Sequence, residues 1–158
     1  MREETDRDFR SKGWGKMLYH QAKSSEYEKI ISIWKRSVLA THHFLKPEDM
    51  SSIEAEIRYW LPKMNVQVWS QSEKMIGFSA VSEDTLEMLF IGPDQIGKGY
   101  GKQILKELLS AFEVTKVDVN EQNEAAVTFY LKNGFQIVSR DELDSEGRAY
   151  PILHLELT

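Results

Sequence analysis

Apolar side chains recur at helical spacing in four parts of the chain, and this periodicity predicts four amphipathic helices. They are expected over residues 26–39, over 48–61, from a glycine-rich turn to residue 112, and over 124–132. Ser25 and Glu28 have the spacing of a capping box for the first helix, and Pro62 follows the second. The buried side of the second helix is predicted to carry Ile53, Ile57, Trp60 and Leu61.

Shorter apolar runs, which alternate with polar residues or are bounded by turn residues, predict strands. The expected strands are 17–22, 65–70, 75–82, 85–91, 115–119, 135–139 and 151–157. Residues 1–15 contain few apolar side chains and no periodic pattern, so we expect an N-terminal extension followed by one domain over residues 16–158. The order of the elements predicts an α+β fold with a single mixed sheet flanked by helices.

The composition is that of a soluble globular protein, because 41% of the 158 residues are hydrophobic and 28% are charged. No apolar stretch approaches the ~20 residues that span a bilayer, and the charged N-terminus lacks the apolar core of a signal peptide. We therefore expect a cytoplasmic protein with no membrane partner. The sequence has no cysteine and no metal-ligand spacing among its four histidines, so no metal is expected. A net charge of −5 argues against a general nucleic-acid binder.

A glycine-rich turn joins the strand predicted over 85–91 to the following helix. Gly97, Gly99 and Gly101 alternate with Lys98, Tyr100 and Lys102. Glycines let the main chain approach a ligand closely, and a helix start presents unpaired N–H groups and a partial positive charge. This junction is typical of a phosphate-binding site.

Two common phosphate-binding motifs fit this turn poorly. Residues 92–99 nearly match the P-loop pattern G-x-x-x-x-G-K-[ST], but Gly99 stands where a Ser or Thr hydroxyl binds Mg²⁺. A dinucleotide fingerprint needs G-x-G-x-x-G, and here the third glycine comes one residue early.

The turn and a later segment together resemble the GNAT superfamily of N-acetyltransferases. Its pyrophosphate loop reads [RQ]-x-x-G-x-G/A, which fits Gly99 and Gly101 and departs at Ile96, where Arg or Gln is usual. Its later motif, N-x-x-A-x-x-[FL]-Y-x-K-x-G-F, matches Asn123, Ala126, Phe129, Tyr130, Lys132, Gly134 and Phe135. The resemblance covers residues 16–157, points to a small bacterial subgroup of uncertain substrate, and implies a mostly antiparallel sheet.

The resemblance implies that acetyl-CoA is the cofactor. The backbone of Met88, Leu89, Phe90 and Ile91 would hold its pantetheine arm, with an N–H near Leu89 or Phe90 as oxyanion donor. Its pyrophosphate would lie on Ile96, Gly97, Lys98, Gly99, Tyr100, Gly101 and Lys102. Further contacts are expected from Asn120, Asn123, Ala126, Phe129 and Tyr130.

The implied reaction is acetyl transfer to a primary amine of a small molecule, peptide or protein, by direct attack in a ternary complex. Tyr130 is the candidate general acid, because a phenol with a pKa of about 10 can protonate a departing thiolate whose thiol has a pKa of about 8.5. Glu87 is the candidate base, with Glu83 and Asp84 as rivals.

Histidines and aromatic side chains are the candidates for the acceptor pocket, which is expected to contain Trp34, His42, His43, Phe44 and Tyr150. His154 is the remaining histidine of interest. The alternative function is a non-catalytic acyl-CoA sensor or interaction module on the same fold. Exposed strand edges leave room for a homodimer.

Overall fold

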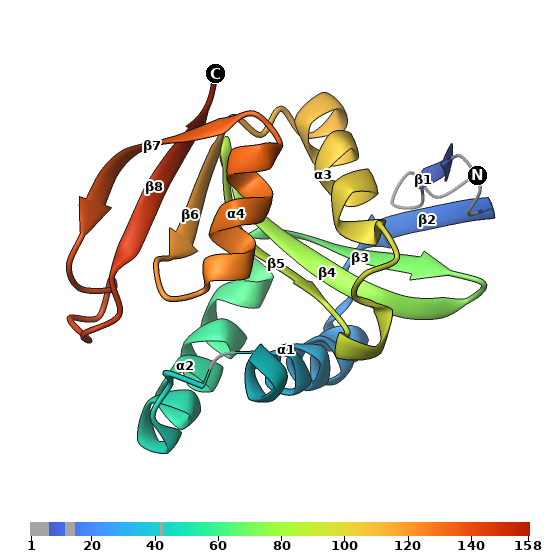
Figure 1. Ribbon diagram of the computed structural model, residues 1–158. Helices are drawn as coiled ribbons and strands as arrows, with labels where there is room; N and C mark the ends of the chain where they lie inside the picture. Colours follow the sequence, from blue (N-terminus) through green and yellow to red (C-terminus); the bar gives the residue numbers. More distant parts are fainter. Residues whose placement is uncertain (1–6, 12–14, 42) are drawn as a thin grey trace.

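Among the described residues, eight strands form one sheet in the order β1-β2-β3-β4-β5-β6-β8-β7. The computed structural model describes residues 7–11, 15–41 and 43–158 (Figure 1). The strands are β1 (Arg7–Ser11), β2 (Gly15–Gln21), β3 (Asn65–Gln71), β4 (Lys74–Ser82), β5 (Thr85–Ile91), β6 (Lys116–Asn120), β7 (Phe135–Asp141) and β8 (Ile152–Leu157). Only β5 and β6 pair in parallel, and every other neighbouring pair is antiparallel. The predicted fold class, a single mixed and mostly antiparallel sheet flanked by helices, is confirmed.

In the part of the chain that the structure describes, four α-helices cover the two faces of this sheet. They are α1 (Tyr27–Thr41), α2 (Pro47–Trp60), α3 (Tyr100–Ala111) and α4 (Glu124–Lys132). Figure 1 shows α1 and α2 on one side of the sheet and α3 and α4 on the other. Short 3₁₀ turns at Ser24–Glu26, Leu61–Lys63 and Pro93–Gln95 join helices and strands.

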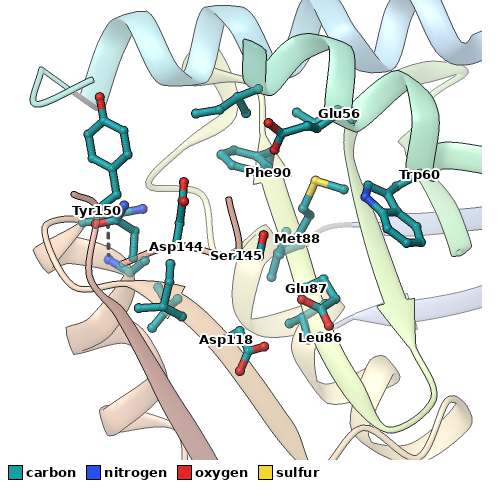
Figure 2. Close-up of a pocket in the computed structure, with 18 of the residues that line it drawn as sticks. Glu56, Trp60, Leu86, Glu87, Met88, Phe90, Asp118, Asp144, Ser145 and Tyr150 are labelled. Carbon is teal, nitrogen blue, oxygen red and sulfur yellow. Dashed lines mark hydrogen bonds between the residues drawn. The ribbon is translucent and has the colours of Figure 1, made fainter. Parts of the chain in front are cut away.

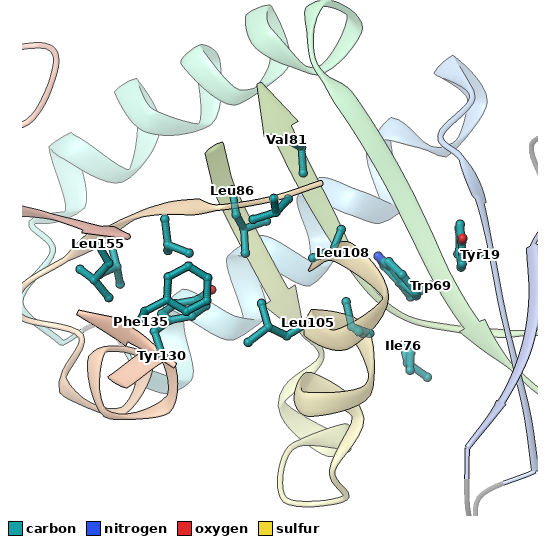
Figure 3. Packing of buried hydrophobic residues seen from close by; sticks show 14 of the residues in the cluster. Tyr19, Trp69, Ile76, Val81, Leu86, Leu105, Leu108, Tyr130, Phe135 and Leu155 are labelled. Atoms are coloured by element: carbon teal, nitrogen blue, oxygen red, sulfur yellow. The ribbon is translucent and has the colours of Figure 1, made fainter. Parts of the chain in front are cut away.

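Each face has its own hydrophobic core, since side chains alternate between the faces along a strand. Along β5, Met88 and Phe90 pack into the core beneath α1 and α2, whereas Leu89 and Ile91 pack into the core beneath α3 and α4. Figure 3 shows part of the core beneath α3 and α4, in which side chains from these two helices meet side chains from strands β2 to β8. Both faces of β5 are therefore covered, and its backbone is held in place from both sides.

Strands β5 and β6 separate soon after they meet. Their paired residues are Thr85 with Lys116 and Leu86 with Val117, and none of the described residues beyond these continues the ladder. The register between β4 and β5 also shifts here, which leaves Glu87 as an extra residue between Leu86 and Met88. A bulge of this kind bends a strand and re-aims a side chain. The sheet thus opens into a V with Glu87 at its apex.

Two local predictions are wrong. The predicted capping box of Ser25 and Glu28 does not form, because Glu26 accepts the N–H of Lys23 at 2.9 Å and also contacts His20 Nε2 at 2.9 Å. Trp60 is 48% exposed instead of buried, although its neighbour Leu61 is buried as expected.

Strand β1 lies within the stretch 1–15, whose pattern predicted no element, and it pairs with β2. Residues 1–6 and 12–14 lie outside the described residues. That the stretch is an extension separate from the domain stays a prediction.

Candidate active site

A cleft of about 950 Å³ lies where β5 and β6 diverge. Its walls come from β5, β6, α2, α4, β8 and the loop between β7 and β8 (Figure 2). The cleft exists because no described strand fills the space between the separating edges, and because α1 and α2 cover β3–β5 and leave the polar face of β6 and β8 uncovered. Residues far apart in the sequence therefore meet around one hollow.

Two carboxylates face each other at the apex of the V. Glu87 follows Leu86, and Asp118 follows Val117, which are the last paired residues of β5 and β6. Since Leu86 and Val117 point into the core beneath α3 and α4, the next side chains point to the opposite face, into the cleft. Burial within the cleft walls raises the pKa of Glu87, and the neighbouring Asp118 raises it further, while His154 opposes the shift. Glu87 is open to the cleft, yet it holds its proton more tightly than a surface carboxyl group.

A carboxylate–histidine–carboxylate bridge forms the far wall. His154 Nδ1 lies 2.7 Å from Asp118 Oδ1, and His154 Nε2 lies 2.7 Å from Asp141 Oδ2. Asp118 is the cross-strand partner of His154. Asp141 reaches the same face because β7 carries an extra residue, Val138, between the residues opposite Leu155 and His154. The hydrogen bonds to Asp141 and Asp118 raise the pKa of His154.

Tyr130 reaches the cleft from α4. Its ring is 5% exposed and packs edge-on against Phe129 and Phe135, with centroid distances of 5.1 Å and 5.9 Å. The structure records no hydrogen bond between its hydroxyl and another described residue, and the residue lines the cleft. Burial raises the pKa of Tyr130 well above its usual range, so the phenol remains protonated.

The rim opposite β6 is built from α2 and the β7–β8 loop. Tyr150 donates to Asp49 Oδ2 at 2.5 Å and accepts the N–H of Lys46 at 3.0 Å. Arg148 pairs with Glu56 of α2 and, at 2.7 Å, with Asp144 of its own loop. These contacts tie the loop to the start and middle of α2.

Of the residues predicted for the acceptor pocket, three line the cleft. Trp34 and Phe44 do so together with Tyr150, and the rings of Phe44 and Tyr150 lie 6.1 Å apart. His43 is exposed and is not among the lining residues, and His42 lies outside the described residues.

The glycine-rich loop lies at the start of α3. Gly97 and Gly99 have φ values of +86° and +83°, which L side chains rarely adopt, so glycine is required there. At Gly101, a Cβ atom would stand 3.4 Å from Ile91 Cδ1 and 3.5 Å from Phe129 Cζ. Ile91 and Phe129, both predicted to contact the cofactor, therefore lie directly beneath the loop.

The other predicted loop residues differ in exposure. Ile96 is 56% exposed, and Lys98 donates to Gln95 Oε1 at 3.3 Å. Lys102 is exposed on the first turn of α3, while Tyr100 is half-buried against the core.

The remaining predicted cofactor contacts fall along the cleft wall, at Met88, Leu89, Phe90, Asn120, Asn123 and Ala126. Both asparagines also have local roles. Asn123 caps α4 by accepting the N–H of Ala126 at 3.3 Å, and Asn120 accepts the N–H of Gln122 at 2.8 Å. The rival bases Glu83 and Asp84 line a different hollow, where Asp84 lies 4.0 Å from Lys116. Glu87 is thus the only one of the three predicted bases in the cleft.

The sequence did not predict a role in the site for several residues that line the cleft, namely Glu56, Trp60, Asp118, Asp141, Asp144 and Arg148. The sequence contains a signal that could have pointed to Asp118, because it is a charged residue in the middle of the apolar run V-D-V. Asp141 had none, since only the bulge in β7 brings it to the cleft face. Among the described residues, no group of His, Asp and Glu side chains is placed to hold a metal ion. No described helix is both long and apolar enough to cross a membrane.

The sequence matches the family model described as an acetyltransferase (GNAT) domain over residues 32–151. This chain belongs to the GNAT acetyltransferase family. It is 38% identical over 136 residues to the peptidyl-lysine N-acetyltransferase YjaB of Escherichia coli strain K12, a match that covers 85% of this chain and 92% of that protein. Family membership with this identity makes the chain an acetyl-CoA-dependent N-acetyltransferase, as the sequence predicted.

Solved structures agree with the fold. The solution structure of apo YjaB from Escherichia coli superposes with a TM-score of 0.83 at 36% identity, covering 90% of this chain and 97% of that one. A PaiA N-acetyltransferase from Thermoplasma acidophilum, solved in complex with coenzyme A, shares the fold at 18% identity with a TM-score of 0.67, covering 89% of this chain and 98% of that one.

Proposed function

We propose that this GNAT enzyme acetylates the ε-amine of lysine side chains in peptides or proteins. The observation that carries the acceptor class is the charge of the cleft. Its lining carboxylates are Glu56, Glu87, Asp118, Asp141, Glu142 and Asp144, against the cationic side chains Lys63 and Arg148 and the histidine His154. Arg148 is already paired with two of the carboxylates, so an excess of negative charge faces an incoming acceptor. The electrostatic field of this negative charge favours an acceptor with a cationic side chain over one with a neutral or anionic side chain.

Two relatives support the same acceptor. The proteins from Escherichia coli and Salmonella typhimurium, 38% and 39% identical to this chain, are both peptidyl-lysine N-acetyltransferases by name. That activity belongs to those two proteins, and the charge of the cleft is the independent argument for this chain.

The residues of the cleft fit acetyl-CoA. Beyond Leu86, the edge of β5 that faces β6 has no described strand partner, so the backbone of 87–91 can pair with the amides of the pantetheine arm. The glycine-rich loop and the first turn of α3 would bind the pyrophosphate, with Lys98 and Lys102 adding charge. Ile96 offers no polar group, and the amide oxygen of Gln95 is already bound to Lys98, so Lys98 is the better substitute for the usual Arg or Gln.

The cleft residues then divide the proton transfers between them. Glu87 accepts the proton of the lysine ammonium, which must become neutral to attack. Acetyl-CoA supplies a thioester whose carbonyl carbon bonds to the amine nitrogen while the C–S bond breaks. A backbone N–H near Leu89 or Phe90 would hold the oxyanion. Tyr130 donates a hydrogen bond to the departing thiolate.

Tyr130 gives up its proton less readily than the unperturbed phenol that the sequence led us to expect. Because burial raises its pKa, complete transfer of its proton to a thiolate is uphill when the thiol has a pKa of about 8.5. A neutral phenol still stabilises a thiolate as a strong hydrogen-bond donor. We therefore assign Tyr130 to stabilising the departing thiolate through a hydrogen bond, while the proton that the attacking nitrogen loses as the amide forms would end on the sulfur.

The acceptor class is tested by comparing two peptides with acetyl-CoA and following thiol release. One peptide has a single lysine and a blocked α-amine, and the other has a free α-amine and no lysine. We expect turnover of the first peptide only, with mass spectrometry placing the acetyl group on the ε-nitrogen. A peptide with glutamates flanking the lysine should react more slowly than one with flanking arginines. The difference between the two rates should become smaller at high salt. Acetylation of the α-amine alone would contradict the proposal.

Replacing Gly99 by Val is expected to weaken acetyl-CoA binding by at least about tenfold. A β-branched side chain at φ +83°, at the N-cap of α3, costs on the order of 1–2 kcal/mol or shifts the loop. Isothermal titration calorimetry measures the affinity.

The matched control is Gly147→Val. Gly147 has φ +82° and open space around it, but it lies in the β7–β8 loop. This variant should lose similar stability and keep its affinity for acetyl-CoA. Equal affinity in both variants would remove the glycine-rich loop from the binding site.

A further inference from the structure

The bridge of Asp118, His154 and Asp141 spans three neighbouring strands of the cleft wall. Both ring nitrogens of His154 lie 2.7 Å from a carboxylate oxygen. A neutral imidazole carries one N–H only, so one of these contacts would set a nitrogen lone pair against an oxygen lone pair. An imidazolium donates to both oxygens, which makes the charged ring the form that this geometry favours.

The bridge lies beside the candidate base. Asp118 stands across the apex of the V from Glu87, and both Asp118 and His154 act electrostatically on Glu87. Without a cation between them, three carboxylates would share this end of the cleft. A carboxyl group next to other carboxylates retains its proton, because like charges disfavour its ionised form.

We propose that His154 is a positioning residue whose charged ring, clamped between Asp118 and Asp141, keeps Glu87 ionised and ready to accept the proton of the acceptor amine. This inference rests on the proposed lysine acetylation and adds to it a residue that does not touch the reacting atoms. The bulge in β7 is part of this arrangement, because it brings Asp141 onto the same face of the sheet as His154.

The other titratable groups of the cleft are less suited to this role. Glu56 and Asp144 share Arg148, which pairs with both of them at the α2 rim. Tyr130 stays protonated because of its burial. The remaining titratable residues that line the cleft are Lys63, Glu142 and Tyr150. Of all these groups, only Asp118 and His154 contribute to the shift in the pKa of Glu87.

His154→Gln tests the proposal, because glutamine retains a hydrogen-bond donor and removes the charge. We expect kcat/KM for a lysine peptide to fall about 3- to 10-fold at pH 7 and to return to the wild-type value near pH 9, where Glu87 is ionised in either protein. The KM for acetyl-CoA should not change.

The matched control is His20→Gln. His20 also pairs with a carboxylate, Glu26, at 2.9 Å, but it lies on β2 and not in the cleft. This variant should keep the wild-type pH profile, so the same substitution separates an effect on the cleft from a general effect of losing a histidine that pairs with a carboxylate.

A second readout needs no turnover. In wild type and His154→Gln, the ¹³C resonance of the Glu87 side-chain carboxyl is followed from pH 3 to 9, and Glu87 should titrate at higher pH in the variant. An unchanged Glu87 titration together with an unchanged pH profile in a folded His154→Gln variant would overturn the inference. Absence of turnover in wild type would instead overturn the lysine acceptor, and the titration would still decide the role of His154.

Discussion

Tyr130→Phe is expected to lower kcat by about 10²- to 10³-fold without weakening acetyl-CoA binding. The hydroxyl is the one group lost, and no described residue hydrogen-bonds to it, so it is available to the departing sulfur. The phenylalanine ring keeps the edge-on contacts with Phe129 and Phe135. Loss of the Tyr130 hydroxyl should therefore lower the rate of the chemical step, which single-turnover transfer measures. It should leave unchanged the affinity for acetyl-CoA, which calorimetry measures.

Tyr19→Phe is the control for this substitution. Tyr19 is also a buried tyrosine, but its hydroxyl hydrogen-bonds to Glu107 Oε2 at 2.5 Å in the core beneath α3, away from the cleft. The control should lower the free energy of unfolding by about 1 kcal/mol and leave kcat unchanged. A Tyr130→Phe enzyme as fast as the wild type would show that the phenol does not assist the leaving group.

The sequence predicted the elements well where one face of a helix or strand is buried. Strand β5 and helix α4 have the predicted bounds, because the apolar run 85–91 and the motif from Asn123 to Gly134 both begin and end at clear turn signals. Prediction was weaker where tertiary contacts decide. The helical pattern of α2 includes Trp60, but the V-shaped opening of the sheet leaves no core for it to enter, and its ring lines the cleft instead.

The site was predictable to the extent that single motifs place it. Tyr130 and Glu87 both line the cleft, and each follows from a local pattern, the first from the helix motif and the second from its place in the strand before the glycine-rich loop. The bridge on His154 was not predictable. It depends on the pairing order β6-β8-β7 and on one extra residue in β7, and a one-residue change of register reverses the face on which a side chain lies.

The cleft combines two demands that oppose each other. For the proposed acceptor, its negative charge would attract a lysine ammonium, and the same charge would stabilise the proton that must leave before the nitrogen can attack. A base with a raised pKa eases this conflict, because it accepts a proton more readily than an ordinary surface carboxylate does. Glu87 has this property through burial and through Asp118. The charged ring of His154 would limit the shift, so that Glu87 is not already protonated at neutral pH.

Glu87→Gln is therefore expected to lower kcat/KM for a lysine peptide by about 10²-fold at pH 7. The glutamine cannot accept the proton, so the variant depends on the small fraction of free lysine that is already neutral. That fraction rises about tenfold per pH unit below the amine pKa of about 10.4, and the rate of the variant should rise with it. Initial rates from pH 6 to 9.5 measure both slopes, and a variant whose profile parallels that of the wild type would assign the base elsewhere.

The same substitution should leave the fold intact or stabilise it. The pKa of Glu87 is raised in the folded chain, so its ionised form destabilises the native state at pH values above the ordinary carboxyl pKa of about 4.3. Glutamine removes that penalty, and Glu87→Gln should melt at the same or a higher temperature than the wild type at pH 7. The difference should vanish below about pH 4, where the carboxyl group is protonated in both the folded and unfolded states. Lost activity with retained or increased stability is the combination expected of a catalytic base held in an unfavourable environment, whereas a group that merely supports the fold would lose both together.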